Sequence, residues 1–311
     1  MKTCFVTGGA GFIGSHLVKE LLKNYRVIVV DNVSSGSENN IKQFKDNKNF
    51  MFVKHDIKES IKIDEHADYI FHLASRASPV DFAKYPVDIL LTNSMGTYNM
   101  LVLAKEHNAR FLLASTSEVY GDPLQHPQKE EYWGNVNPHG VRSCYDESKR
   151  FGESMAMAFH RMYKLDVRIA RIFNTYGPLM RADDGRVIPT FIAQAIRNKP
   201  ITIHGSGKQI RSFCYVSDMA EGLIRLMFIK NLNGDVFNLG NEEESSILDI
   251  ANIIKNMTGS KSRILFTPRP ANDPERRKPD ISKAKRLLEW EPKVILEDGL
   301  KETIEYFKNN I

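Results

Sequence analysis

The chain has few cysteines and no apolar run long enough to cross a membrane. Its three cysteines, Cys4, Cys144 and Cys214, are too few and too scattered over 311 residues to form a disulfide framework. No stretch approaches the roughly 20 apolar residues that a membrane-spanning helix needs. The first residues enter a strand pattern without a signal peptide. We therefore expect reduced thiols, no membrane association and a cytoplasmic location.

The chain also lacks the charge pattern of a nucleic-acid-binding protein and the spacing of a metal site. Its net charge is only +5, and its lysines and arginines are not gathered in a basic tract with interleaved aromatic residues. Its nine histidines include no His-x-x-x-His pair and no Cys/His cluster. We predict neither a nucleic-acid partner nor a bound metal. A mild positive excess is compatible with an anionic small substrate.

Short apolar runs alternate along the chain with amphipathic helical patterns. This alternation favours an α/β fold, with a Rossmann-type doubly wound parallel sheet and helices on both of its faces. Expected strands cover residues 3–7, 26–31, 50–54, 69–73, 110–114 and 166–171, and expected long helices cover residues 87–106 and 145–163.

A glycine motif, Gly8-Gly-Ala-Gly11-Phe12-Ile13-Gly14, stands between the first expected strand and a helix. Glycines there permit a tight turn and let backbone amides approach a pyrophosphate at the helix N-terminus. Asp31, followed by Asn32, ends the second strand, where a carboxylate binds an adenosine ribose and repels a 2′-phosphate; this favours NAD over NADP. Asp56 and Ile57 end the third strand and are expected to cradle the adenine, although a plain strand-end turn also explains Asp56.

Tyr145 and Lys149 lie four residues apart and would share one face of a helix. An adjacent ammonium lowers the pKa of a phenol, here from about 10 towards neutrality. The phenol would then accept a proton from a sugar or alcohol hydroxyl, while a nicotinamide cofactor takes the hydride. Taken alone, this pair also fits an exposed pair on a helix.

The pattern changes after Asn174 to loops rich in proline and glycine, with helices expected at residues 189–197 and 296–308. We expect an NAD-binding Rossmann domain over residues 1–171 and a smaller C-terminal α/β substrate lobe over residues 172–311. Residues 236–239 form a candidate strand that would return to the main sheet.

Five further segments carry a more specific signal. They are Phe71-His-Leu73-Ala-Ser75, Leu113-Ala-Ser-Thr-Ser-Glu-Val-Tyr-Gly-Asp-Pro123, Ser143-Cys-Tyr-Asp-Glu-Ser-Lys-Arg150, Ala170-Arg-Ile-Phe-Asn-Thr-Tyr-Gly-Pro178 and Arg277-Lys-Pro-Asp-Ile281. In combination they resemble the UDP-glucuronate decarboxylases, also called UDP-xylose synthases, a branch of the extended short-chain dehydrogenases/reductases. The resemblance runs from the first strand to the last helix and adds Leu73 to the expected cofactor-binding residues.

The resemblance implies a reaction in three steps. Bound NAD+ takes a hydride from C4 of the glucuronosyl ring while the tyrosine accepts the hydroxyl proton. The C5 carboxylate is then β to a ketone and leaves as CO2, because its electrons pass into an enolate that hydrogen-bond donors stabilise. Protonation at C5 and return of the hydride give UDP-xylose and regenerate NAD.

The resemblance also implies the catalytic roles. Tyr145 is the base, Lys149 tunes it and binds the nicotinamide ribose, and Thr116 binds the C4 oxygen. Glu118 and Arg277 act in the decarboxylation, with Arg277 either steering the carboxylate or helping to deliver the proton. Without the resemblance, Arg277 would be interpreted as a surface charge in the charged run 275–278.

For the substrate, the resemblance implies Tyr85 near the sugar and Asn174 near the diphosphate. Arg186, Val187 and Arg211 are expected around the UDP moiety. Two arginines suit a diphosphate because each guanidinium pairs with phosphate through two hydrogen bonds.

Single residues separate the neighbouring families. The related 4,6-dehydratases carry an aspartate where this chain has Ser117, and 4-epimerases typically lack a glutamate at Glu118. The chain departs from the decarboxylases at Arg76 and Val141, where the family usually has proline, and at Leu179, where it often has arginine.

Two alternatives stay open. One is a UDP-glucuronate 4-epimerase, or a relative that releases the 4-keto pentose with NADH, and the other is a non-catalytic NAD-binding scaffold. The family resemblance also implies a homodimer packed through the helices at residues 87–106 and 145–163.

Overall fold

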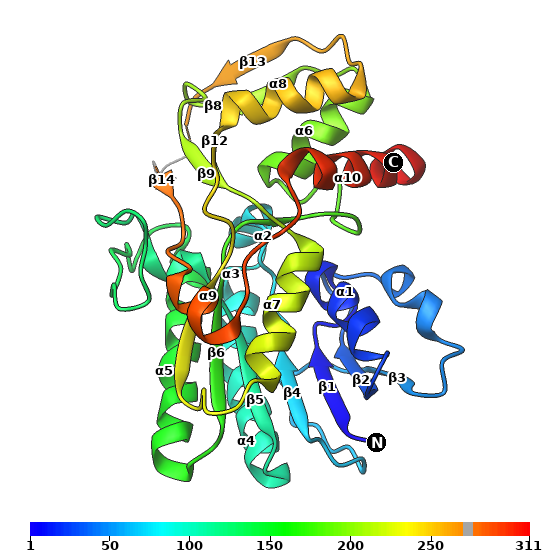
Figure 1. Cartoon of the computed structure of the whole chain (residues 1–311), viewed down its shortest axis with the longest axis vertical. Coiled ribbons are helices and arrows are strands. Elements are labelled where there is room, and N and C mark those ends of the chain that lie inside the picture. The colour runs from blue at the N-terminus through cyan, green and yellow to red at the C-terminus, as the bar shows by residue number, and fades with distance from the viewer. Residues whose placement is uncertain (270–275) are drawn as a thin grey trace.

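A computed structural model of the chain describes residues 1–269 and 276–311, so the first residue of the charged run 275–278 lies outside it. A seven-stranded parallel sheet forms its centre and confirms the Rossmann-type α/β fold (Figure 1). The order of its strands is β11-β6-β5-β4-β1-β2-β3. They are β1 (Thr3–Thr7), β2 (Arg26–Asp31), β3 (Phe50–Lys54), β4 (Tyr69–His72), β5 (Arg110–Thr116), β6 (Val167–Ile172) and β11 (Asp235–Leu239).

Helices cover both faces of this sheet, which is why its central strands are apolar on both sides. All five residues of β1 are buried. On one face α1 packs against α7, and on the other α4 packs against α5. These helices are α1 (Phe12–Leu21), α4 (Thr97–His107), α5 (Ser143–Tyr163) and α7 (Val216–Phe228).

The candidate strand near residues 236–239 does return to the main sheet. It forms β11, which pairs in parallel with β6 in a register that places Phe237 opposite Ala170. Helix α7, also from the second half of the chain, packs against α1, and α9 (Ser282–Leu288) packs against β11. Residues on both sides of position 171 therefore build the sheet.

The remaining elements form a smaller lobe above the carboxyl ends of the strands (Figure 1). It contains a separate apolar core, to which α6, α8 and α10 contribute. Its helices are α6 (Val187–Ile196), α8 (Ile247–Thr258) and α10 (Leu296–Asn310), and its strands are β8 (Ile201–His204), β9 (Ile210–Ser212), β12 (Glu244–Ser246), β13 (Ile264–Thr267) and β14 (Arg276–Arg277). The short strands β7 (Thr175–Tyr176) and β10 (Cys214–Tyr215) pair with each other where the chain passes between the sheet and the lobe.

The first expected long helix is interrupted. Residues 87–106 divide into α3 (Pro86–Leu91), a π-helical turn η3 (Thr92–Gly96) and α4, with the short helix α2 (Pro79–Lys84) before them. In the π-helical turn, the buried side chain of Asn93 donates a hydrogen bond of 3.0 Å to Ser148 of α5. A single π-helical turn of this kind widens a helix locally, and a 3.6-residue pattern does not reveal it.

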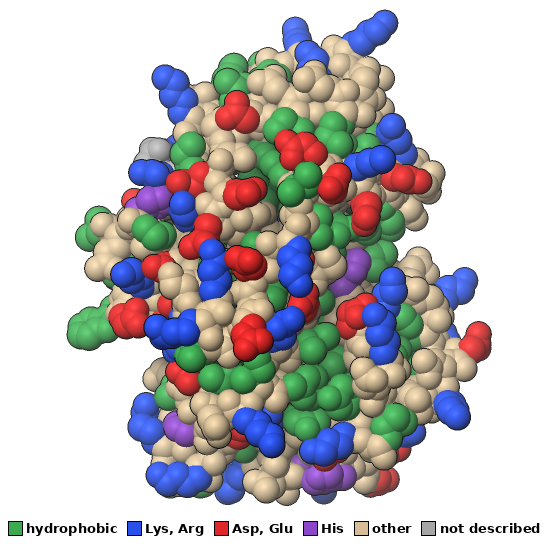
Figure 2. Space-filling view, in the orientation of Figure 1, with side chains coloured by type: hydrophobic (Ala, Val, Ile, Leu, Met, Phe, Trp, Pro, Cys, Tyr) green, Lys and Arg blue, Asp and Glu red, His purple; other side chains and the backbone are tan. Residues whose placement is uncertain are grey.

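The surface carries charges of both signs. On the face drawn in Figure 2, lysine and arginine side chains are interspersed with aspartate and glutamate. Of the helices that the structure describes, none combines the length and the apolar character needed to cross a membrane.

We predict that the strand supplied by the second half of the chain is essential to stability. Phe237→Ala should lower the free energy of unfolding by about 3 to 5 kcal/mol in urea denaturation, because the ring is fully buried. Phe266→Ala is the matched control, since that ring is 51% exposed on β13, and should change the value by about 0.5 kcal/mol or less. Equal losses in the two variants would contradict this reading of β11.

Candidate active site

A cavity of about 1080 Å³ lies where the sheet meets the lobe. It includes the end of β1, next to β4, where the strand order reverses and open α/β sheets bind ligands. Almost every residue proposed from the sequence lines it. These are Gly8, Gly11, Phe12, Ile13, Gly14, Asp31, Asn32, Asp56, Ile57, Leu73, Thr116, Glu118, Tyr145, Lys149, Asn174, Arg186, Val187, Arg211 and Arg277.

The glycine motif forms a turn that side chains would obstruct. Gly8 has a φ of 72°, and a Cβ on it would lie 2.7 Å from the backbone nitrogen of Ala74. A Cβ on Gly14 would lie 2.2 Å from the carbonyl oxygen of Gly8. Because glycine occupies both positions, the loop closes tightly before α1 and leaves a cradle for a phosphate group.

Asp31 fastens this loop to the end of β2. Its carboxylate accepts hydrogen bonds from the backbone nitrogens of Ala10 (3.0 Å) and Val33 (2.8 Å). Burial raises the pKa of this carboxyl, and the two amide donors oppose that effect. The side chain lines the cavity while accepting one bond at each oxygen, and each carboxylate oxygen accepts more than one. It therefore fits the expected ribose hydroxyls.

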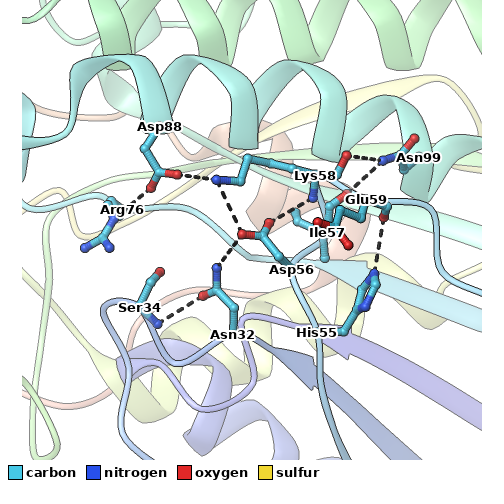
Figure 3. A network of polar contacts seen from close by, with 10 residues as sticks. All are labelled: Asn32, Ser34, His55, Asp56, Ile57, Lys58, Glu59, Arg76, Asp88 and Asn99. Carbon is cyan, nitrogen blue, oxygen red and sulfur yellow. Dashed lines mark hydrogen bonds and ion pairs between the residues drawn. The ribbon is translucent and has the colours of Figure 1, made fainter.

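Asn32 and Asp56 meet at the predicted adenosine end of the cavity (Figure 3). The Asn32 amide donates to Asp56 over 3.0 Å, and the Lys58 ammonium lies 3.4 Å from the same carboxylate. Lys58 also pairs with Asp88 of α3. The carbonyl oxygen of Ile57 accepts from Asn99 at 2.9 Å. Sequence reasoning missed Lys58, because its partner Asp88 lies 30 residues away.

Tyr145 and Lys149 do share one face of α5, and both are buried. The Lys149 ammonium lies 5.8 Å from the centre of the Tyr145 ring and donates a 2.9 Å hydrogen bond to the carbonyl oxygen of Ala114. Thr116, at the end of β5, makes a hydrogen bond with the Tyr145 phenol.

The expected lowering of the Tyr145 pKa is wrong for this structure. Burial raises the pKa of the phenol, and the hydrogen bond with Thr116 offsets only part of that rise. Burial also lowers the pKa of Lys149 to about 8. The four-residue spacing indicated that Tyr145 and Lys149 lie close together. It did not indicate that burial would have a larger effect on their pKa values than the attraction between the ammonium and the phenolate.

Glu118 stands at the centre of a partly buried ion cluster. Arg277 of β14 binds both of its carboxylate oxygens, at 2.5 and 3.0 Å, and Arg142 adds a third contact at 2.6 Å. Burial by itself raises the pKa of Glu118, but the two arginines outweigh it and bring the pKa to about 2. Arg277 is 3% exposed, so it is not the surface charge that its charged neighbours suggested.

Arg142 and Asp146 are site residues that sequence reasoning missed, although both lie in the segment that contains Tyr145. Together with Glu118 and Arg277 they line a second, smaller cavity of about 250 Å³. Burial and the nearby Glu118 charge raise the pKa of Asp146. The available signal was an arginine three residues before the tyrosine and an aspartate directly after it.

The residues expected to bind the substrate lie towards the lobe, with one exception. Arg186, the residue before α6, pairs through two nitrogens with Asp184, and the Asn174 amide donates to the carbonyl oxygen of Ser212 at 3.4 Å. Tyr85 does not line the cavity. Its ring is 44% exposed and stacks against the Arg76 guanidinium at 4.2 Å, so its place beside the sugar stays a prediction.

The residues of the cavity fit a dinucleotide. The glycine cradle, Asp31 and the buried Lys149 suit a pyrophosphate and two ribose groups. Within residues 1–269 and 276–311, no group of three His, Cys, Asp or Glu side chains is placed to hold a metal.

Comparison with known proteins places these features in a wider group. Residues 5–303 match the family described as GDP-mannose 4,6 dehydratase. The chain is 54% identical over 307 residues to UDP-glucuronic acid decarboxylase 1 of Arabidopsis thaliana, covering 98% of this chain and 70% of that protein. It is 50% identical to UDP-glucuronic acid decarboxylase 1 of Danio rerio, covering 100% of this chain and 73% of that protein.

Solved structures show the same architecture. The UDP-glucose 4-epimerase of Thermotoga maritima, solved with UDP-glucose, has a TM-score of 0.89 at 31% identity, covering 99% of both chains. A dTDP-glucose 4,6-dehydratase of Streptomyces venezuelae, solved with NAD, has a TM-score of 0.92 at 27% identity, covering 99% of this chain and 97% of that one.

We predict that the ion cluster makes stability depend on pH in acid. The Glu118 pKa lies below its ordinary value of 4.5, so its contribution is present above pH 4.5 and is lost as the pH falls towards about 2. Glu118→Gln should lower the free energy of unfolding near pH 7 by about 3 kcal/mol and weaken its fall below pH 4.5, as urea denaturation at several pH values would measure. Glu20→Gln, at an exposed pair with Lys23, is the control and should leave the acid profile unchanged.

Proposed function

This chain belongs to the UDP-glucuronic acid decarboxylases, within the GDP-mannose 4,6-dehydratase family, and we propose that it converts UDP-glucuronate into UDP-xylose and CO2. The observation that carries this proposal is the partly buried Glu118–Arg277 pair, which lines the same cavity as Tyr145. The ion pair is suited to binding a carboxylate, and the tyrosine is suited to accepting the proton of an alcohol that is being oxidised. NAD bound in the glycine-lined half of the cavity supplies a hydride acceptor and, when oxidised, a positive charge.

Tyr145 is proposed as the proton acceptor for the C4 hydroxyl of the sugar. Burial keeps its phenol protonated in this structure, so the oxidised cofactor and Lys149 are needed to favour the anion. The hydrogen bond between Thr116 and Tyr145 supports Thr116 as a second residue that binds the C4 oxygen of the sugar. Lys149 fits the nicotinamide ribose, because its ammonium is buried and reaches the cavity.

Glu118 and Arg277 are proposed to act at the C5 carboxylate. Arg277 reaches the cavity wall while two of its nitrogens bind Glu118. A guanidinium held in this way orients the substrate carboxylate without a large cost in side-chain entropy. Arg142 shares the Glu118 carboxylate and belongs to the same proposed group. Once C4 is a ketone, the bond between C5 and the carboxylate can break and release CO2. Its electron pair passes into an enolate that Thr116 and Tyr145 stabilise.

Arg186 and Arg211 are proposed to bind the UDP diphosphate, with Asn174 and Val187 beside them. All four line the lobe side of the cavity. Arg186 is held by Asp184, which fixes the plane of its guanidinium before a ligand arrives. Ser117, the first residue after β5, lacks the acidic group that a 4,6-dehydratase places between its threonine and glutamate.

We predict that purified protein given UDP-glucuronate and NAD+ forms UDP-xylose without net accumulation of NADH. Proton NMR would follow the sugar products, and absorbance at 340 nm would follow NADH. Tyr145→Phe should lower turnover by a factor of about 10² or more, because it removes the proton acceptor, while NAD binding is retained.

The products decide between the proposal and its alternatives. UDP-galacturonate would indicate a 4-epimerase, and accumulated 4-keto pentose with NADH would indicate an enzyme that stops after decarboxylation. An unchanged substrate would exclude UDP-glucuronate as the substrate. The control is Tyr163→Phe at the other end of α5, whose ring is 42% exposed, and it should keep full turnover.

We also propose a homodimer formed through α3, η3, α4 and α5. Large apolar side chains are exposed on these elements, among them Val87, Leu91, Met95, Tyr98 and Phe151. Exposed apolar side chains gathered on neighbouring helices are typical of an interface between protein chains. An isologous contact would bring the same helices of two copies together.

The proposed dimer predicts that a charged side chain placed in its interface separates the two subunits. Met95→Asp should convert the dimer into a monomer in sedimentation equilibrium, because it would bury a carboxylate in the interface. Leu265→Asp, at a residue that is 43% exposed on β13 of the lobe, is the matched control and should leave the mass unchanged. A monomeric wild-type protein would contradict the proposal.

We propose a cytoplasmic location because the cysteine thiols form no disulfide within the described residues. The three cysteines are free and buried. Free thiols are usual in reducing compartments, whereas secreted proteins tend to pair them.

A further inference from the structure

Arg76 is the residue of the cavity wall that the proposed chemistry leaves without a role. It follows β4 in the loop that leads to α2, directly after Ser75, and it lines the cavity. Its side chain is 13% exposed. The sequence already marked it as a departure, because the resembling family usually has proline there.

The guanidinium of Arg76 is held in a fixed orientation by two groups. Its Nε lies 3.0 Å from the carboxylate of Asp88 on α3, and its face lies 4.2 Å from the centre of the Tyr85 ring. Asp88 is itself fixed by Lys58. An ion pair at one edge and an aromatic ring on one face define both the position and the plane of the group.

This arrangement leaves the two terminal nitrogens of Arg76 available. Neither has a hydrogen-bond or ion-pair partner within the parts of the chain that the structure describes. In Figure 3 both point away from Asp88. These two nitrogens form the fork that binds a phosphate group through two parallel hydrogen bonds.

The charges around the cavity indicate which ligand this fork meets. Between Gly8 and Thr92, Arg76 is the only lysine or arginine among the lining residues. The same half of the wall contains the glycine cradle and the carboxylates of Asp31 and Asp56. A dinucleotide placed there would carry two negative charges on its pyrophosphate, and the acidic side chains of this wall would repel them.

We propose that Arg76 binds a phosphate of the bound dinucleotide through its two terminal nitrogens, with Asp88 and Tyr85 holding the guanidinium in place. This rests on the proposed use of NAD, because the pyrophosphate belongs to that cofactor. It also gives Tyr85 and Lys58 a role, since they orient the phosphate-binding group. The diphosphate of the nucleotide sugar is the other source of the same chemistry.

Two binding measurements test this inference. Isothermal titration calorimetry measures the binding of ADP-ribose, and saturation-transfer NMR measures the binding of adenosine, which has no phosphate. Arg76→Gln should weaken the binding of ADP-ribose by about tenfold or more, because a charged bidentate contact is lost. Binding of adenosine should change little. The affinity of Arg76→Lys for ADP-ribose should lie between those of the wild type and Arg76→Gln, because lysine keeps the charge but lacks the two parallel donors.

Two controls separate a phosphate contact from general damage. Lys54→Gln removes a positive charge from β3 that does not line the cavity, and it should leave ADP-ribose binding unchanged. Asp88→Asn keeps the shape of its side chain but releases Arg76, and should weaken ADP-ribose binding by less than Arg76→Gln does.

Each outcome is decisive. An equal loss of adenosine and ADP-ribose binding in Arg76→Gln would mean that Arg76 only shapes the loop, and unchanged ADP-ribose binding would overturn the inference outright. If Arg76→Gln weakened the binding of UDP but not that of ADP-ribose, the phosphate contact would belong to the nucleotide sugar, and its assignment to the dinucleotide would be overturned. Wild-type protein that binds no ADP-ribose would instead overturn the proposed cofactor, and this inference with it.

Discussion

The partly buried ion cluster of Glu118, Arg142 and Arg277 is the constraint on which the geometry of the site depends. It joins the turn that follows β5, the residue before α5 and the strand β14, although Glu118 and Arg277 are 159 residues apart in the chain. Partial burial of these charges is costly, and the two arginines compensate Glu118 only because their nitrogens lie within ion-pair distance of its carboxylate. Removing one partner would leave the other charges uncompensated, so the cluster constrains the positions of all three side chains.

The parallel sheet explains why these groups meet. Parallel strands bring all their carboxyl ends to one edge, so the residues that follow β1, β2, β4 and β5 face the same cavity. Helix α5 then places Tyr145 and Lys149 beside the end of β5, where Lys149 bonds the carbonyl oxygen of Ala114. The lobe closes the opposite side, and β14 brings Arg277 back from it to the sheet edge.

Desolvation opposes the proposed chemistry until ligands bind. Burial raises the pKa of Tyr145 and lowers that of Lys149, so each group tends towards its neutral form. Glu118 behaves differently because two arginines contact it directly. A buried base beside a carboxylate that is charged at neutral pH suits the proposed site, where an oxidised cofactor would supply the missing positive charge.

The sequence by itself determined the features that depend on neighbours along the chain. Glycine spacing predicted the turn before α1, strand and helix periodicity predicted the sheet, and the four-residue spacing placed Tyr145 and Lys149 on one face of α5. Only the tertiary structure decided which distant charges pair. It joined Arg142 and Arg277 to Glu118, and it placed the Arg76 guanidinium against Asp88 and the Tyr85 ring. The physical reason is that ion pairing and desolvation depend on three-dimensional distance and burial, which local spacing does not contain.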